Sequence, residues 1–163
     1  MAAETRLVAA VDIDGVLADV RHRLHHVRTP PKDWDAFFAA APRDAVLEQG
    51  RETVSRLAEV FDIVYLSGRP ERCREDTRTW LEAHSLPAGQ ELVLRPQGDH
   101  RPARLMKVEA LRRLSRDRTV AVLVDDDPLV LDAARAAGYD VLPADWMPAD
   151  EALRKAQEDE GET

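Results

Sequence analysis

Short apolar runs recur along the chain, and each of them ends at a polar residue. The clearest are Leu7–Val11 before Asp12, Ile63–Leu66 before Ser67, Leu92–Leu94 before Arg95, and Val120–Val124 before Asp125. Uninterrupted apolar runs of this length are typical of strands that are buried on both faces of a sheet. The pattern therefore predicts buried strands with polar side chains at their ends.

The stretches between these runs carry apolar residues at helical spacing. They are Val54, Leu57 and Ala58, then Trp80 and Leu81, then Leu111 and Leu114, and finally Leu129, Ala133 and Ala136. Asp127 followed by Pro128 is typical of a helix start, and Gly138 of a helix end that leads into a short strand at 140–142. Alternating strands and helices predict an α/β, Rossmann-like fold with a mainly parallel five-stranded sheet flanked by helices.

The segment from about residue 20 to 43 is too long for a tight connection, and we expect it to form a small flap or cap over the strand ends. It contains two consecutive prolines and then a short helix that Asp33 is predicted to cap. The aromatic residues of this helix either stack on a base or form the flap's own small core. The second interpretation is favoured for at least two of the three, which are Trp34, Phe37 and Phe38.

Length and charge narrow the class of protein. The 163 residues fit one domain, placed at 1–157, followed by an acidic flexible tail at 158–163. A net charge of -8 argues against an extended surface for duplex nucleic acid. No apolar run approaches the roughly 20 residues of a membrane helix, and Met1 to Leu7 shows no signal-peptide pattern. With one cysteine, these features favour a cytoplasmic protein without a membrane partner, and they do not indicate its oligomeric state.

The polar residues that end the strands are predicted to lie together. In a parallel α/β sheet the ligand binds in the crevice outside the carboxyl ends of the strands. This edge would gather Asp12, Ser67, Arg95 and Asp125. Any strand can end at a polar residue by chance, but four chemically complementary residues at one edge favour a functional site.

Two acidic clusters stand at strand ends. Asp12 and Asp14 precede Gly15, which allows the chain to turn, and the second cluster is Asp125–Asp127. Carboxylates about 4 Å apart repel by roughly 4 kcal/mol at an effective dielectric constant of about 20. A hard divalent cation with oxygen ligands is therefore expected. The alternative is that Asp126 and Asp127 only cap the following helix, an interpretation favoured for Asp127.

The remaining polar residues indicate a phosphate site. Ser67–Arg69 directly follow a strand and offer a hydroxyl and backbone N–H groups to an anion. Lys107 shares a helix face with Leu111 and Leu114, at spacings of four and seven residues, so we predict that it points inward. The alternative is a lysine that extends along the apolar face to the surface.

Together, these residues resemble the four ordered motifs of the haloacid-dehalogenase superfamily of phosphotransferases. The match spans residues 7–142, and its motifs are Asp12–Asp19, Ser67–Arg69, Lys107 and Asp125–Asp126. Within this superfamily, the segment Arg95–Arg101 and the position of Arg23 are similar to the 3′-phosphatase domain of phage-type polynucleotide kinase-phosphatases.

The resemblance implies an Mg²⁺-dependent phosphatase with a covalent aspartyl-phosphate intermediate. The implied catalytic residues are Asp12, Asp14, Ser67 and Lys107. Mg²⁺ would be held by Asp12, Asp14, Asp125 and Asp126, and the substrate by Arg23, Arg69, Arg95 and Gly68. The implied substrate is a phosphomonoester, either the 3′-phosphate end of a polynucleotide or a nucleotide.

Departures from the resemblance leave alternatives open. The chain has no G-x-x-x-x-G-K-[ST] loop, so kinase activity is not expected, and Val16 stands where many members carry threonine. Another small phosphoester, such as a sugar phosphate, is an alternative substrate. A phosphate-binding module without turnover is a different class of alternative, and the intact set of Asp12, Asp14, Lys107 and Asp125 argues against it. Each of the three arginines has the alternative of contacting solvent alone.

Overall fold

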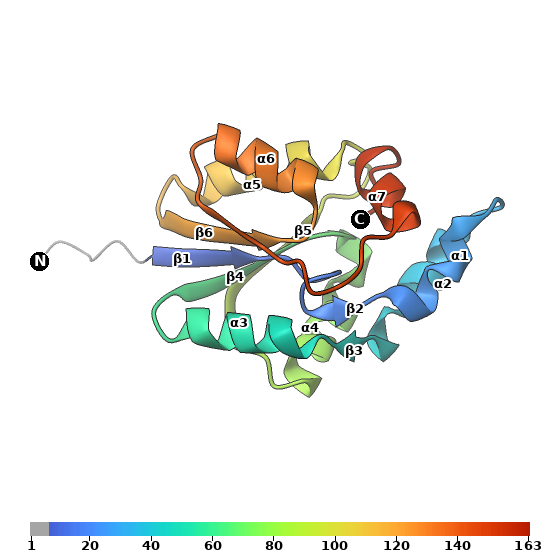
Figure 1. Ribbon diagram of the computed structural model, residues 1–163, viewed down its shortest axis with the longest axis horizontal. Helices are drawn as coiled ribbons and strands as arrows, with labels where there is room; N and C mark the ends of the chain where they lie inside the picture. The colour runs from blue at the N-terminus through green and yellow to red at the C-terminus, as the bar shows by residue number, and fades with distance from the viewer. Residues whose placement is uncertain (1–6) are drawn as a thin grey trace, which may run out of the picture.

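A parallel sheet runs through the middle of the computed structural model, which describes residues 7–163 (Figure 1). Its strand order is β5-β4-β1-β6-β7, and each neighbouring pair is parallel. The strands are β1 Leu7–Val11, β4 Asp62–Pro70, β5 Gly89–Arg95, β6 Thr119–Asp125 and β7 Val141–Pro143. The predicted α/β fold with a five-stranded parallel sheet is confirmed.

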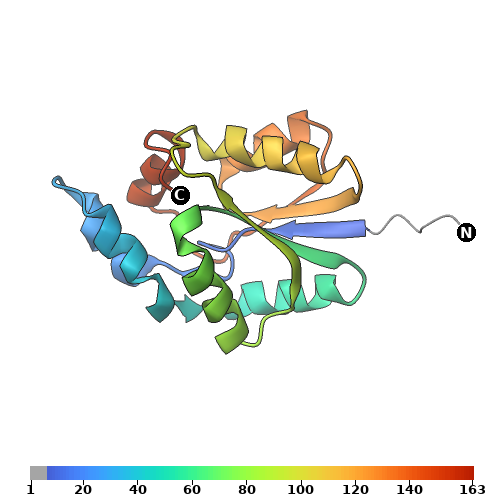
Figure 2. The same cartoon turned by 180° about the vertical axis from the view of Figure 1, so that it is seen from behind.

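Helices cover both faces of this sheet (Figures 1 and 2). They are α3 Glu48–Ala58 and α4 Arg74–Ala83 on one face, and α5 Ala103–Leu114 and α6 Pro128–Ala136 on the other. Side chains of β1 alternate between the two cores: Ala9 and Val11 pack beneath α3 and α4, and Val8 and Ala10 beneath α5 and α6. Because both faces of β1 are buried, its sequence is continuously apolar.

Strand β4 is longer than its apolar run predicts. The run ends at Leu66, but the strand continues through residues 67–69 to Pro70, with an irregular register toward β5. Polar side chains interrupt the hydrophobic pattern here while the backbone stays extended. Residues 67–69 therefore lie in the last part of the strand rather than in a turn after it, and α4 begins only at Arg74.

The segment predicted as a flap leaves and re-enters the domain through a small antiparallel ribbon, β2 Ala18–Asp19 with β3 Ala45–Val46. Between these strands lie four short helical elements, η1 Arg21–Arg23, α1 His25–Arg28, α2 Trp34–Ala39 and η2 Ala41–Arg43. In Figure 1 α1 and α2 extend beyond the end of the sheet toward which β1 points. They are therefore next to the edge where the site is expected.

The aromatic residues of α2 pack on one another and on a hydrophobic cluster that also includes Leu24 of the same segment and Met147 and Leu153 of the domain. Phe37 and Phe38 are buried, and their ring centroids lie 5.1 Å apart. Trp34 is half-buried, with its ring 5.8 Å from that of Phe37. Phe37 and Phe38 are thus core residues, as the favoured interpretation expected, although this core is shared with the rest of the domain. Stacking of a base by Trp34 stays a prediction.

Aspartate side chains cap the helices whose starts were predicted. Asp127 accepts a hydrogen bond from the backbone N–H of Leu129 at 2.9 Å, and Asp33 accepts one from Ala36 at 2.9 Å. Each cap satisfies a backbone donor that the helix itself leaves free. The cap interpretation of Asp127 is therefore supported by its geometry.

The last helix, α7 Glu151–Glu158, leads into the segment for which the sequence predicts an acidic flexible tail. Residues 159–163 fold back against the domain, and Gly161 and Thr163 are buried. The acidic residues of this region are paired: Glu158 contacts Arg104, and Glu160 contacts Lys32. Composition alone predicts a solvated tail because it does not show these distant partners.

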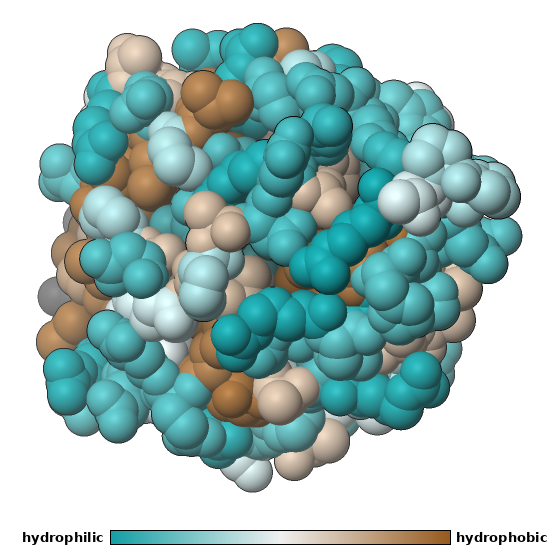
Figure 3. Space-filling view, turned by 45° about the vertical axis from the view of Figure 1, so that its right-hand side comes forward, coloured by the Kyte–Doolittle hydropathy of each residue, from teal (hydrophilic) through white to brown (hydrophobic). Residues whose placement is uncertain are grey.

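Figure 3 shows the side of the molecule on which α1, α2 and α7 lie. This surface is largely hydrophilic, and its hydrophobic residues form small separate patches. Over residues 7–163, no helix is both long enough and apolar enough to cross a membrane. The prediction about a signal peptide concerns residues that lie mostly outside this range.

Candidate active site

A buried lysine joins the ends of two neighbouring strands. Asp12 directly follows β1, Asp125 ends β6, and Lys107 reaches both from α5. The Lys107 Nζ atom lies 2.5 Å from Asp125 Oδ2 and 3.1 Å from Asp12 Oδ1, and the lysine side chain is 3% exposed. Lys107 therefore points inward, as its spacing predicted, and does not extend to the surface.

The charge of this lysine is maintained by its partners. Burial alone lowers the pKa of Lys107, because it disfavours the charged form, but the carboxylates of Asp12 and Asp125 reverse this effect and raise the pKa above its ordinary value. The ammonium group is therefore charged at neutral pH.

Asp12, Asp125 and Asp126 form an acid cluster in which one oxygen of each residue lies within 4.8 Å of the others. Asp126 Oδ1 is buried and has no hydrogen-bond partner in the part of the chain that the structure describes. Gly15, with φ of +80°, allows this packing, since a Cβ atom there would lie 2.4 Å from Asp126 Oδ2. An unpaired buried carboxylate oxygen beside two further acids fits a divalent cation with oxygen ligands.

The raised pKa values of two acids in this cluster also favour a bound cation. Burial, followed by repulsion from Asp125, raises the pKa of Asp12 well above its usual range, and the same two causes raise the pKa of Asp126 to about 7. Lys107 contacts two of these acids, and the partly exposed Arg154 lies 3.7 Å from Asp126. When all three acids are ionised, their negative charge exceeds the positive charge of these two neighbours, and a divalent cation would stabilise the ionised forms.

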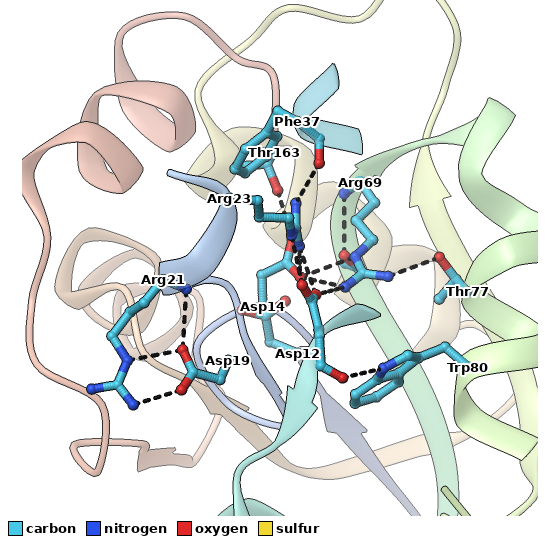
Figure 4. Close-up of polar contacts among 12 residues, drawn as sticks. Asp12, Asp14, Asp19, Arg21, Arg23, Phe37, Arg69, Thr77, Trp80 and Thr163 are labelled. Atoms are coloured by element: carbon cyan, nitrogen blue, oxygen red, sulfur yellow. Dashed lines mark hydrogen bonds and ion pairs between the residues drawn. The ribbon is translucent and has the colours of Figure 1, made fainter. Parts of the chain in front are cut away.

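Asp14 is held by two buried arginines (Figure 4). Arg69 donates to Asp14 Oδ1 from Nε at 3.0 Å and from Nη2 at 2.6 Å, and Arg23 donates to the same oxygen from Nη2 at 3.0 Å. Burial acts to raise the pKa of Asp14, but the charges of Arg69 and Arg23 outweigh it and lower the pKa to about 2. Asp14 is therefore ionised at neutral pH, with its Oδ1 fully engaged.

Asp44 completes this network, and sequence reasoning missed it. It accepts hydrogen bonds from Arg23 Nε at 2.8 Å and Nη2 at 2.9 Å, and from Arg69 Nη2 at 3.1 Å. His22 Nε2 lies 2.6 Å from Asp44 Oδ1. Burial raises the pKa of Asp44 more than the arginines lower it. Asp44 is a lone acid between η2 and β3, so no spacing marks it.

The three arginines predicted to bind substrate are all buried. Arg23 is 0% exposed, Arg69 1% and Arg95 2%, which excludes the alternative of arginines that contact only solvent. Arg95 donates from Nε to the carbonyl oxygen of Gly68 at 3.2 Å and from Nη1 to that of Arg101 at 2.7 Å. Their predicted contact with the substrate stays a prediction.

Ser67 is fully buried near the end of β4, and its hydroxyl accepts a hydrogen bond from the backbone N–H of Arg69 at 3.1 Å. Among the histidines of the segment 22–26, His22 reaches Asp44, while His25 and His26 lie against each other with ring centroids 4.0 Å apart. His22 is therefore the histidine in this segment that joins the charge network around Asp14.

Comparisons with known proteins agree with this geometry. The sequence profile described as the Polynucleotide kinase PNKP phosphatase domain matches residues 7–145. A chain from the structure of a Pnkp1/Rnl/Hen1 complex is 21% identical, with a TM-score of 0.72 over 86% of this chain and 46% of that chain. The tungstate-bound class C acid phosphatase from Bacillus anthracis is 14% identical, with a TM-score of 0.64 over 95% of this chain and 78% of that one.

The haloacid dehalogenase-like protein SP0104 from Streptococcus pneumoniae is 14% identical, with a TM-score of 0.62 over 93% of this chain and 91% of that one. No curated protein sequence matches the chain. This chain spans less than half the length of the chain from the Pnkp1/Rnl/Hen1 complex.

The parallel sheet, with buried aspartates at the ends of β1 and β6, has the fold of the haloacid-dehalogenase class of hydrolases. Because the matched profile covers most of the sequence, the chain belongs to the family of PNKP phosphatase domains.

A divalent cation is expected to raise the melting temperature of the protein, and to raise it more at about pH 8 than at about pH 6. Protons compete with the cation for Asp12 and Asp126, whose pKa values are raised. The raised values mean that the folded state binds these protons more tightly than the unfolded state. Without a cation, the contribution of Asp126 to stability is therefore fully present below the ordinary carboxyl pKa and is lost as the pH rises through about 7.

Thermal unfolding followed by fluorescence, with and without the cation at both pH values, measures this effect. Asp126→Asn should remove most of the cation-dependent shift. Asp132→Asn, which changes a 72%-exposed acid on α6, is the matched control and should keep it. A shift that is independent of pH and unaffected by Asp126→Asn would contradict the assignment.

Asp44→Ala is expected to lower the free energy of unfolding by about 3 to 5 kcal/mol, because it removes one partner of a buried ion-pair network. Asp35→Ala is the control: Asp35 forms a surface ion pair with Arg72 at 2.6 Å, and such pairs contribute about 0.2 to 1 kcal/mol. Denaturant unfolding of both variants measures the difference. Equal losses of unfolding free energy in the two variants would show that the network around Asp14 does not hold the inserted segment, residues 20–43, in place.

Proposed function

We propose that the chain is an Mg²⁺-dependent phosphomonoester hydrolase that acts through an aspartyl-phosphate on Asp12. The observation that carries the proposal is the acid cluster of Asp12, Asp125 and Asp126, in which Asp126 Oδ1 is buried and unpaired. Two residues after Asp12, Asp14 is held ionised by arginines. Membership of the family of PNKP phosphatase domains supports phosphoester chemistry at this cluster.

The reaction would take place in two displacements. An oxygen of Asp12 forms a bond to phosphorus, the bond from phosphorus to the leaving oxygen breaks, and Asp14 gives a proton to that oxygen, so that a neutral alcohol departs. Asp14 then takes a proton from a water molecule whose oxygen attacks phosphorus. The bond between phosphorus and Asp12 breaks, and inorganic phosphate leaves.

The arginines around Asp14 explain how one carboxyl group would serve both steps. Arg69 and Arg23 keep Asp14 ionised while the site holds no substrate. A phosphate dianion adds negative charge beside it, and a like charge raises the pKa of a carboxyl group. Asp14 would therefore take up a proton as the substrate binds, and would return to the ionised state after the alcohol leaves.

The phosphoryl oxygens need donors that are already in position. The Lys107 ammonium and the Ser67 hydroxyl would hold two of them, with a backbone N–H group at Gly68 as a further donor. Mg²⁺ would be held by Asp12, the backbone carbonyl of Asp14, Asp125 and Asp126. When bound, it supplies positive charge to the phosphoryl oxygens as negative charge builds up on them.

A polynucleotide 3′-phosphate end is the substrate that we propose. The similar chains come from structures of a Pnkp1/Rnl/Hen1 complex, one of which is described as an RNA repair complex. Arg95 lines a cavity of about 520 Å³ together with Arg72, His100 and, from the C-terminal segment, Gly161 and Glu162. This volume is within the usual size of a small-ligand site. The nucleotide that carries the 3′-phosphate would lie in this cavity.

Release of inorganic phosphate tests the proposal. The substrates to compare are an oligonucleotide with a 3′-phosphate, the same oligonucleotide with a 5′-phosphate, 3′- and 5′-mononucleotides, and sugar phosphates. The expected order places the 3′-phosphorylated oligonucleotide first, and the activity should vanish when Mg²⁺ is chelated.

Asp12→Asn should reduce turnover to background, because the amide is a poor nucleophile. Asp132→Asn changes an exposed acid on α6, paired with Arg135 and outside all four motifs, and should leave turnover intact. Turnover without metal, or by Asp12→Asn, would refute the mechanism, and equal rates on all substrates would refute the preference for nucleic-acid ends.

A further inference from the structure

The C-terminal segment, residues 159–163, leaves α7 and enters the candidate active site. Asp159 and Glu160 donate backbone hydrogen bonds to the carbonyl oxygen of Lys155, both at 2.9 Å, and Glu162 donates one to Ala156 at 2.9 Å. These bonds turn the chain back toward the carboxyl end of the sheet. Figures 1 and 2 show the end of the chain beside α7, next to that edge.

Thr163 occupies groups that the proposed reaction requires. Its hydroxyl donates to Asp14 Oδ2 at 3.2 Å (Figure 4). Its carbonyl oxygen accepts a hydrogen bond from Arg95 Nη2 at 3.3 Å. Its backbone lies so close to Gly68 that a Cβ atom there would be 2.2 Å from the carbonyl carbon of Thr163. Only 4% of Thr163 is exposed, so the contact closes this part of the site.

The oxygen that Thr163 contacts is the one left free on Asp14. Arg23 and Arg69 both bind Oδ1, so the proton exchanged with a leaving group would be carried by Oδ2. A hydroxyl that donates to Oδ2 stands where the alcohol product would stand after phosphoryl transfer. The segment therefore resembles a bound product.

Contacts of two glutamate side chains hold the segment from two sides. On the side of the inserted segment, Lys32 pairs with Glu160. On the side of the loop between β5 and α5, His100 Nδ1 lies 3.5 Å from Glu162 Oε1. Gly161, with φ of +59°, passes so near this loop that a Cβ atom would lie 2.0 Å from the carbonyl oxygen of His100. Any larger residue at 161 would push the segment away.

We propose that residues 159–163 act as an autoinhibitory segment, in which Thr163 takes the place of the leaving alcohol and Glu160 occupies the Lys32 ammonium group, which a polyanionic substrate would use. The placement of the substrate rests on the proposed function. Substrate and segment bind the same groups, so they exclude each other, and the segment must leave before catalysis.

Removal of residues 159–163 is expected to lower the KM for an aryl phosphate about tenfold while kcat changes by less than about twofold. A closed state that holds about nine molecules in ten reduces the apparent affinity by this factor. Gly161→Val keeps the length and charge of the segment and should lower KM in the same direction. Gly138→Ala is its control, because Gly138 also has a positive φ but has no atom within 4 Å of the added Cβ, and KM should not change.

An amidated synthetic peptide with the sequence of residues 158–163 should inhibit the shortened protein, and the inhibition should be competitive with the aryl phosphate. Competitive inhibition by the separate peptide would show that the segment acts by occupying the site rather than by altering the fold.

Calorimetric binding of inorganic phosphate gives a readout that does not depend on turnover. The shortened protein should bind phosphate about tenfold more tightly than the full chain. Equal phosphate affinities, with equal KM values where turnover is measurable, would overturn the autoinhibitory role. A tighter affinity without turnover in any variant would support the segment's role while refuting the proposed phosphatase activity.

Discussion

Lys107 lies buried between Asp12 and Asp125, and the arrangement of the site follows from this contact. An isolated ammonium would be costly to bury, but two carboxylates within hydrogen-bond reach keep it charged. The parallel sheet provides the carboxylates, because β1 and β6 are neighbours and end side by side. Helix α5 provides the lysine, since the face that packs Leu111 on the sheet also directs Lys107 toward the strand ends.

The second charge network joins parts of the chain that are far apart in sequence. Arg23 comes from the inserted segment, Arg69 from β4 and Asp44 from the connection to β3, and all three meet around Asp14. The ion pairs that hold the inserted segment against the sheet are also the ones that lower the pKa of Asp14. Stability and proposed chemistry therefore depend on the same buried groups. The contact of Thr163 with Asp14 Oδ2 adds the C-terminal segment to this network.

The sequence allowed the sheet and the first charge cluster to be predicted, because both leave local signals. Buried strands appear as apolar runs, and Asp12 and Asp125 stand where those runs end, while the helical spacing of Lys107 indicates its direction. Asp44 leaves no such signal, since its partners come from positions 21 and 25 residues away. The packing of residues 159–163 was not predicted for the same reason. The acidic composition is visible in the sequence, but the partners of these side chains, Lys32 and His100, are visible only in the fold.

The covalent role of Asp12 is the central claim, and chemical trapping tests it most directly. The protein would be mixed with a 3′-phosphorylated oligonucleotide and Mg²⁺, quenched in acid during turnover, reduced with borohydride and digested for mass spectrometry. Borohydride converts an aspartyl-phosphate to homoserine, so the account predicts homoserine at position 12 and none in the absence of substrate. Steady phosphate release with an unchanged aspartate at position 12, or with homoserine at another position, would contradict it.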